Sequence, residues 1–460
     1  MKNDVMSTVV TVLFAASIIF SMLWPLRAAS PPVSDEEIKS ILRERVAAAG
    51  PGITVVAGVI DSAGRRVISE GPGDGDTVFE IGSVTKVFTA LVFADMMERG
   101  EVKLEDAISS FLPQTVKVPS RNGRQITLLD LATHTSGLPR LPDNFAPRDG
   151  SNPYADYTTE KLYEFLSSYE LPRDVGVKYE YSNLGGALLG HVLVLKAGTN
   201  YEALVARRIC QPLGMTNTRI TLPAEGKARL AAGHDASGGS AANWDFGALP
   251  GAGGLRSTAN DLLKFLAANM GLVKTPLATA MNLAQQPRRD TDLSATRVGL
   301  AWCISRRHGA ELNWHNGQTG GYHSFVGFNR DNSRGVVVLA NVAESVDDIG
   351  FHLLDAQNEL AGPGPRSKHT AIRLAPEILD RYAGRYELAP GVFFNLRRDN
   401  GRLLAQLTGQ SYLEIFPESE TEFFYKAVDA QITFVKNDQG EPVALILHQN
   451  GMEQRAEKSK

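Results

Sequence analysis

Gly82-Ser83-Val84-Thr85-Lys86 is the stretch that decides the fold, because it places a hydroxyl and an amine at the head of an apolar helix. An extended segment, residues 77–81, precedes it, and the apolar pattern runs to about Arg99, where Gly100 stops it. Ser83 and Lys86 are three residues apart and share one helix face. A helix N-terminus favours developing negative charge, and a serine becomes nucleophilic when a nearby base takes its proton. The stretch therefore predicts a serine nucleophile with a lysine base.

The same two residues also have a purely structural interpretation. Ser83 at the head of a helix is typical of an N-cap, and Lys86 would then face solvent. Ser-x-x-Lys arises by chance about once in a chain of this length and ordinary composition. It occurs once here, among apolar neighbours. Other parts of the chain must decide between the two interpretations.

Composition limits the possible functions. The 460 residues are 43% hydrophobic and 21% charged, enough for one large domain and a smaller one. A net charge of −4 argues against nucleic acid as a partner. Cys210 and Cys303 are expected to be buried free thiols, although a pairing between them stays open. Because zinc-type Cys/His spacing is absent from the sequence, we expect no metal and no cofactor.

The N-terminus predicts export. Residues 9–23 are almost wholly apolar, Lys2 precedes them, and Ala28-Ala29-Ser30 follows as a possible cleavage site. This favours a signal peptide over residues 1–30. Asp4 and Arg27 depart from the usual pattern, so an uncleaved anchor and a membrane tether stay open. Either way, we expect the rest of the chain to be periplasmic or secreted.

The remaining chain predicts two domains. Residues 31–361 begin with a helix from Ser34 and a hairpin over 53–70, continue through mainly helical sequence over 101–289, and end in strands at 298–305, 313–315, 322–329 and 335–342 and a helix over 345–361. Strands at both ends suggest one sheet with an inserted helical lobe. Residues 362–371 are rich in Gly and Pro and predict a linker. Residues 372–460 alternate short strands with turns, which indicates a small antiparallel β-barrel.

A second motif could complete a Ser–Lys site. Acyl transfer needs a proton shuttle to the leaving group and a group that holds the substrate carbonyl. Tyr181-Ser182-Asn183 offers both, on a loop before a predicted helix over 185–196. A Tyr181 phenol whose pKa is lowered by a nearby ammonium could act as base and acid, and Asn183 could bind Lys86 and substrate. The alternative is a loop in which Asn183 caps the helix.

A third motif could supply the oxyanion site. Lys196-Ala197-Gly198 has the form Lys-x-Gly of such a motif. It is better explained as the C-terminal end of a helix followed by its capping glycine. His315-Asn316-Gly317 lies in a predicted strand instead, where a glycine often marks a close approach. If this is an edge strand, the backbone N–H of Gln318 could join that of Ser83 as an oxyanion donor, and a peptide-like substrate could pair with the strand.

With the three motifs in this order, the chain resembles the penicillin-recognising serine hydrolases, in the branch of class C β-lactamases, D-alanyl-D-alanine peptidases and related esterases. The resemblance covers residues 34–361. Besides the three motifs, it rests on residues 79–83, 131–139, 212–215 and 253–258. It implies an α/β fold in which an antiparallel sheet flanked by helices meets an all-α lobe. The C-terminal barrel resembles the lipocalin-like domain that often follows such hydrolases.

The resemblance also implies roles for the motif residues. Ser83 would be acylated, Lys86 and Tyr181 would share the acid and base work, and Asn183 would bind substrate. His315 and Gly317 would line the far side of the site. His134, in a Thr-His-Thr-Ser-Gly segment, would be structural and hold a loop.

One residue departs from the class C pattern. His315 stands where dedicated β-lactamases carry lysine, and histidine is largely neutral at pH 7. The hypothesis is an exported serine hydrolase that cleaves an amide, in a D-amino-acid peptide or a β-lactam, through a Ser83 acyl-enzyme. Its partner would be a small-molecule or peptidoglycan-peptide substrate. A family carboxylesterase or a non-catalytic penicillin-binding sensor remains the alternative, and the oligomeric state stays open.

Overall fold

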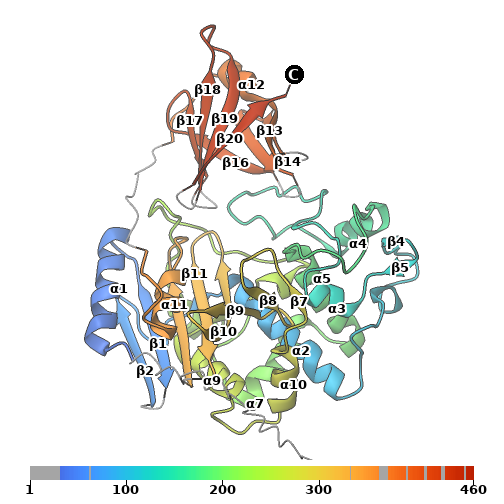
Figure 1. Cartoon of the computed structure of the whole chain (residues 1–460), viewed down its shortest axis with the longest axis vertical. Coiled ribbons are helices and arrows are strands. Elements are labelled where there is room, and N and C mark those ends of the chain that lie inside the picture. Colours follow the sequence, from blue (N-terminus) through green and yellow to red (C-terminus); the bar gives the residue numbers. More distant parts are fainter. Residues whose placement is uncertain are drawn as a thin grey trace, which may run out of the picture.

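The structure, a computed structural model, describes residues 32–61, 64–331, 333–361, 371–389, 392–408, 412–425, 430–449 and 452–459 (Figure 1). The predicted signal peptide or anchor over 1–30 and nearly all of the predicted linker over 362–371 lie outside these residues. None of the helices described is long and apolar enough to span a bilayer.

The predicted sheet from both ends of the first domain is confirmed. Its eight strands run in the order β2-β1-β12-β11-β10-β9-β8-β7, and β1 pairs antiparallel with β12, so that Val55 lies opposite Ala340. The strands are β1 Val55–Asp61, β2 Gly64–Glu70, β7 Arg289–Asp290, β8 Thr296–Val298, β9 Cys303–Arg307, β10 Ala310–Gln318, β11 His323–Asn329 and β12 Arg334–Ala340.

Helices cover both faces of this sheet, which explains why β11 and β12 are buried along their whole length. α1 (Asp35–Ala49) and α11 (Asp347–Leu354) pack on one face, and α9 (Ala259–Asn269) packs on the other (Figure 1). Alternate residues of β1 enter different cores: Val55 and Ala57 join the α1 side, whereas Val56 joins the α9 side. This is the period-two pattern of a strand buried on both faces.

The central helix forms as predicted. The 3₁₀ turn η1 (Gly82–Val84) leads directly into α2 (Thr85–Glu98). Every residue of α2 from Thr85 to Met96 is buried, because the helix is enclosed on all sides. The rings of Phe88 and Phe265, from α2 and α9, stack with centroids 4.3 Å apart.

The helical lobe also follows the prediction, with shorter elements. Within it, the helices α6 (Tyr201–Val205) and α7 (Gln211–Leu213) are joined by a π-helical turn η3 (Ala206–Cys210). The other elements are η2 Ile108–Ser110, α3 Leu128–Ala132, α4 Thr159–Ser168, α5 Asn183–Ala197, α8 Ala224–Ala228, η4 Pro250–Ala252, α10 Ala278–Ala284 and the short pairs β3 Phe79–Glu80 with β6 Arg256–Ser257 and β4 Ser120–Arg121 with β5 Arg124–Gln125.

Three predicted elements differ in extent. The strand predicted over 298–305 is a hairpin: β8 ends at Val298, Ala301 adopts a positive φ of 61°, and β9 begins at Cys303. The helix predicted over 345–361 ends at Leu354, because Asp355 turns extended (φ −152°, ψ 113°). The predicted strand over 313–315 extends in both directions to become β10.

The C-terminal segment forms a closed eight-stranded antiparallel barrel, which confirms the predicted small β-barrel. Aromatic side chains fill its interior: Tyr382 stacks on Phe434 with ring centroids 4.1 Å apart, and Phe423 meets Phe434 edge-on. The elements are α12 Pro376–Tyr382, β13 Gly384–Ala389, β14 Val392–Asp399, β15 Arg402–Leu407, β16 Leu413–Pro417, β17 Glu422–Tyr425, β18 Ala430–Lys436, β19 Pro442–Gln449 and β20 Met452–Lys458.

Candidate active site

Ser83 and Lys86 contact each other at the start of α2. The Nζ of Lys86 lies 2.9 Å from the Oγ of Ser83, and the helix N-terminus uses no side-chain cap. The N-cap interpretation of Ser83 is therefore wrong in this structure, and so is the solvent-facing lysine, since Lys86 is only 2% exposed.

The environment of Lys86 favours its neutral form. Burial lowers its pKa well below the usual value, and the positive charge of Arg140 lowers it further. Gly186 makes room for the side chain, because a β-carbon there would lie 3.0 Å from the Cε of Lys86. A lowered pKa suits a lysine that must accept a proton.

Nζ has three polar neighbours, which a neutral amine can satisfy by donating two hydrogen bonds and turning its lone pair to the third. Nζ lies 2.9 Å from the side-chain Oδ1 of Asn183 and 2.7 Å from the backbone oxygen of Ala252, and both can only accept hydrogen bonds. A neutral amine donates its two N–H groups to these acceptors. Its lone pair then faces the third neighbour, the hydroxyl of Ser83.

Asn183 is free for this contact because its neighbour caps the helix. The Oγ of Ser182 accepts a hydrogen bond from the backbone N–H of Gly185 at 2.8 Å, so Ser182 is the N-cap of α5. The alternative in which Asn183 caps the helix is thus wrong. Asn183 is the first residue of α5 and points its amide at Lys86.

Tyr181 joins the pair, but in a different protonation state from the one predicted. It makes a side-chain hydrogen bond with Ser83, and its ring centroid lies 5.0 Å from the Nζ of Lys86. Burial raises the pKa of Tyr181 to about 12, outweighing the Ser83 hydrogen bond and the charge of Arg140. The predicted lowering of this pKa is therefore wrong, because desolvation dominates. Tyr181 is a proton donor near neutral pH.

Tyr154 is a neighbour of the site that the sequence analysis missed. The Nδ2 of Asn183 donates to the hydroxyl oxygen of Tyr154 at 3.3 Å. The Tyr154 ring packs among Phe145, Trp244 and Phe246. It therefore fixes which way the Asn183 amide faces, with the oxygen toward Lys86. Its loop has no periodic pattern or motif that could have pointed to this role.

His134 supports the Tyr181 loop from behind. It is 3% exposed, its Nδ1 accepts a hydrogen bond from the backbone N–H of Ser182 at 3.2 Å, and its ring lies 4.5 Å from that of Tyr181. Burial lowers its pKa well below the usual value. A neutral, buried acceptor fits the loop-holding role that the resemblance implies.

His315 reaches the opposite side of the site from β10. Its ring centroid lies 6.3 Å from that of Tyr181, and its Nδ1 lies 2.6 Å from the backbone oxygen of Asn316. A carbonyl oxygen only accepts, so Nδ1 carries a proton. Burial, the main cause, lowers the pKa of His315 to about 4, which leaves the ring neutral near pH 7.

Gly317 and Gly82 let β10 lie directly against the turn that carries Ser83. A β-carbon on Gly317 would lie 2.1 Å from the backbone oxygen of Ile81 and 2.8 Å from the backbone nitrogen of Ser83. A β-carbon on Gly82, whose φ is +47°, would lie 2.6 Å from the backbone nitrogen of Gln318. The amides of Ser83 and Gln318 therefore flank one glycine-lined contact, as two oxyanion donors must.

The strand that carries this motif is not an edge strand, which corrects the prediction. β10 lies between β9 and β11. Its register with β9, however, ends at Trp314, whereas its register with β11 continues to Gln318 opposite His323. Among the described strands, residues 315–318 thus pair on one side only, and the motif meets a local edge.

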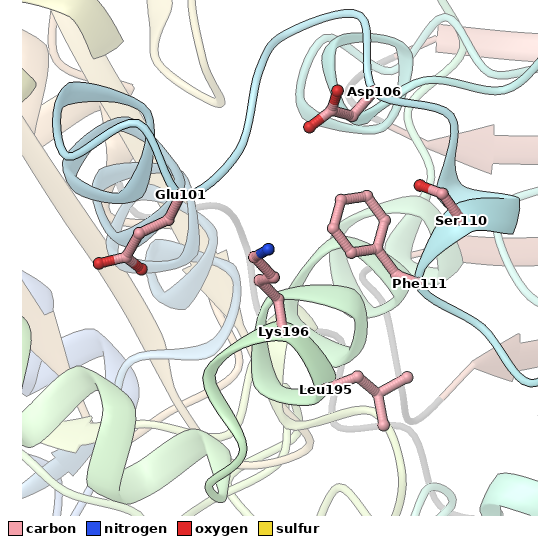
Figure 2. Close-up of a pocket in the computed structure, with 6 residues that line it drawn as sticks. All are labelled: Glu101, Asp106, Ser110, Phe111, Leu195 and Lys196. Atoms are coloured by element: carbon pink, nitrogen blue, oxygen red, sulfur yellow. The ribbon is translucent and has the colours of Figure 1, made fainter.

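One pocket of the described structure lies away from these groups. It has a volume of about 460 Å³ and is lined by Glu101, Asp106, Ser110, Phe111, Leu195 and Lys196, from the segment after α2 and the last turn of α5 (Figure 2). Leu195 is twelve residues from Asn183 along α5, or about 18 Å at 1.5 Å per residue. No three His, Cys, Asp or Glu side chains in the described ranges cluster as a metal site would need. Both cysteines are buried and free.

Comparison with known proteins identifies two families along the chain. Residues 39–357 match the family named Beta-lactamase, and residues 368–458 match one described as a domain of unknown function, DUF3471. The D-alanyl-D-alanine-carboxypeptidase/endopeptidase AmpH of Escherichia coli strain K12 is 34% identical over 269 residues, covering 56% of this chain and 68% of that protein. Penicillin-binding protein 4* of Bacillus subtilis strain 168 is 27% identical over 414 residues, covering 84% and 88%.

Solved structures share the fold. A β-lactamase/D-alanine carboxypeptidase from Yersinia pestis, complexed with citrate, has a TM-score of 0.60 at 24% identity and covers 70% of this chain and 97% of its own. An octameric penicillin-binding protein homologue from Pyrococcus abyssi has a TM-score of 0.61 at 22% identity and covers 92% and 99%. Together with the family match over more than half of its length, these findings show that the chain is a serine hydrolase that belongs to the β-lactamase family.

Proposed function

We propose that this chain cleaves the amide of a β-lactam or a D-amino-acid peptide through an acyl-enzyme on Ser83. The contact of 2.9 Å between the Nζ of Lys86 and the Oγ of Ser83 carries the proposal. The AmpH relative, named as a D-alanyl-D-alanine carboxypeptidase and endopeptidase, supports the choice of substrate. Export through the N-terminal segment is part of the proposal and rests on the sequence pattern alone.

The acylation step follows from the protonation states. Lys86 takes the proton of Ser83 as Oγ attacks the carbonyl carbon, and the oxyanion accepts hydrogen bonds from the backbone N–H groups of Ser83 and Gln318. As the C–N bond breaks, Tyr181 gives its proton to the leaving nitrogen and regains one from the Lys86 ammonium. The serine proton thus ends on the leaving amine.

Hydrolysis of the acyl-enzyme uses the same groups in reverse order. Water attacks the ester carbon, its proton passes to the Tyr181–Lys86 pair, and the proton returns to the Oγ of Ser83 as the ester bond breaks. Asn183, oriented by Lys86 and Tyr154, offers an amide to the substrate.

A substrate panel tests the proposal. Wild type and Ser83→Ala are assayed with nitrocefin, a D-alanyl-D-alanine peptide and p-nitrophenyl esters, and labelled with a fluorescent penicillin. Ser109→Ala is the control, because Ser109 is exposed and bonds only the side chain of Gln125 among the described residues. We expect label and amide turnover in wild type and control and neither in Ser83→Ala.

Two other outcomes would select the alternatives. Ester hydrolysis without penicillin labelling or amide turnover would identify a carboxylesterase, which the neutral His315 in place of a lysine favours. Labelling without turnover of any substrate would identify a penicillin-binding sensor.

A further inference from the structure

His315, on the far side of the site, offers no positive charge to an anionic substrate. His315 holds its one proton on Nδ1, toward the backbone oxygen of Asn316, 2.6 Å away. Its Nε2 is buried and has no hydrogen-bond partner among the described residues. A deprotonated ring nitrogen is an acceptor, and it cannot hydrogen-bond a carboxylate. A carboxylate on the substrate must therefore find its partner elsewhere.

Arg140 places a cation beside the acylating groups. Its guanidinium carbon lies 5.3 Å from the centroid of the Tyr181 ring, and the Nζ of Lys86 lies 5.0 Å from the same centroid. The backbone oxygen of Arg140 accepts a hydrogen bond from the N–H of Leu184 at 3.1 Å. This bond anchors its loop at the start of α5, one residue from Asn183.

Arg140 has no acidic partner among the described residues, unlike three arginines near it in sequence. Arg173 pairs with Glu180, Arg124 with Asp130, and Arg148 with Asp156. In the described part of the chain, no carboxylate lies within ion-pair distance of Arg140, and its side chain is exposed. A guanidinium over an aromatic ring keeps its N–H edge available for a carboxylate.

We propose that Arg140 binds a carboxylate of the substrate, so that the site selects anionic substrates from the Tyr181 side and not through His315. This inference rests on the proposed function and specifies its substrate class. Arginine suits the task because it offers two parallel N–H donors to a carboxylate.

The carboxylate can belong to either end of the substrate, and two matched pairs distinguish the ends. A D-alanyl-D-alanine peptide and its C-terminal amide differ only in a charge on the leaving group. Mono-p-nitrophenyl glutarate and p-nitrophenyl butyrate differ mainly in a charge on the acyl group. Each pair is assayed with wild type, Arg140→Gln, Arg140→Lys and the control Arg148→Gln, a nearby arginine whose side chain is 91% exposed.

We expect Arg140→Gln to raise KM for the acid of at least one pair about tenfold relative to its neutral partner, the loss of roughly one charge-assisted contact. Arg140→Lys should recover part of the preference, and Arg148→Gln should keep all of it. Loss of Arg140 also removes one charge that lowers the pKa of Lys86. That effect changes both members of a pair alike, so the ratio within the pair isolates carboxylate binding.

The results separate this inference from the proposed function. If Arg140→Gln changes both members of each pair by the same factor, or changes neither, the inference is wrong while Ser83-dependent turnover still supports the function. If wild type hydrolyses nitrocefin but neither pair, the proposed function stands and this inference is wrong; if it hydrolyses none of these substrates, the proposed function fails, and the inference falls with it.

Discussion

The α-carbon of Gly317 lies so close to the backbone of Ser83 that no larger residue fits between them: a β-carbon would come within 2.8 Å of the Ser83 nitrogen. The sheet is further joined to the turn that carries Ser83 by Ser324 of β11. Its hydroxyl donates a hydrogen bond to the backbone oxygen of Ile81 at 2.8 Å. The position of Ser83 is therefore set by the sheet as well as by its own helix.

Replacement of Gly317 by alanine should move β10 away from Ser83. We expect kcat/KM to fall by about a hundredfold or more, the usual cost of losing an oxyanion donor. Gly150→Ala is the control, because a β-carbon there meets nothing within 4 Å. Full activity of Gly317→Ala would show that the contact does not position the oxyanion site.

Replacement of Lys86 by methionine should remove the base and keep most of the buried volume. We expect kcat/KM to fall by about 10² to 10⁴, the range for a general base. Circular dichroism should show the fold intact. A decrease of less than tenfold would assign the proton of Ser83 to another group.

The pH profile should have an acid limb without an alkaline one. The Lys86 pKa is lowered, so the amine is active above that pKa and loses activity as pH falls through it. The pKa of Tyr181, about 12, keeps the phenol protonated on the alkaline side. Steady-state kcat/KM between pH 4 and 10 measures this, and a decrease at the alkaline end would instead indicate a titrating Tyr181.

His315 should make the fold less stable in acid. Its pKa is about 4 when folded and near 6.5 when unfolded, so the unfolded chain binds the extra proton between these values. Stability is full above pH 6.5 and falls as pH drops toward 4, by about 3 kcal/mol for this group. Urea unfolding at pH 7.5 and 4.5 should show a smaller difference in His315→Gln than in wild type. An equal difference would remove His315 as the source.

Tyr154→Phe should loosen the Asn183 amide without disturbing the ring cluster. Loss of one neutral hydrogen bond predicts a decrease in kcat/KM of about threefold to tenfold. Tyr157→Phe is a matched control, because its hydroxyl bonds Asn144 and its ring packs on the same Phe145. If both variants behave alike, Tyr154 acts only through packing.

The three motifs could be predicted because each is local. Ser83 and Lys86 meet because a helix brings residues three apart onto one face, and Gly317 marks a strand that another backbone approaches. That the three motifs come together in one site could be predicted only from the family resemblance, because residues 83, 181 and 315 are far apart in sequence. The hairpin at Ala301 was not predicted. The turn depends on the positive φ of Ala301, which the apolar residues around it do not signal.

Other features could not be predicted from local pattern. Tyr154 and Arg140 lie on loops, where tertiary packing and not periodicity decides what a side chain meets. The predicted shift of the Tyr181 pKa had the wrong sign. The sequence shows that a lysine is near, but it does not show that the phenol is buried away from solvent. In the barrel, β16 and β17 have weak alternation and only become evident once their neighbours pair with them.

The burial of Lys86 has a calorimetric consequence. At any pH between its unfolded and folded pKa values, the amine is charged in the unfolded chain and neutral in the native one, so folding expels a proton into the buffer. The heat of folding should therefore depend on the ionisation enthalpy of the buffer chosen. The same active-site amine would be visible, without any substrate, as a difference between phosphate and Tris.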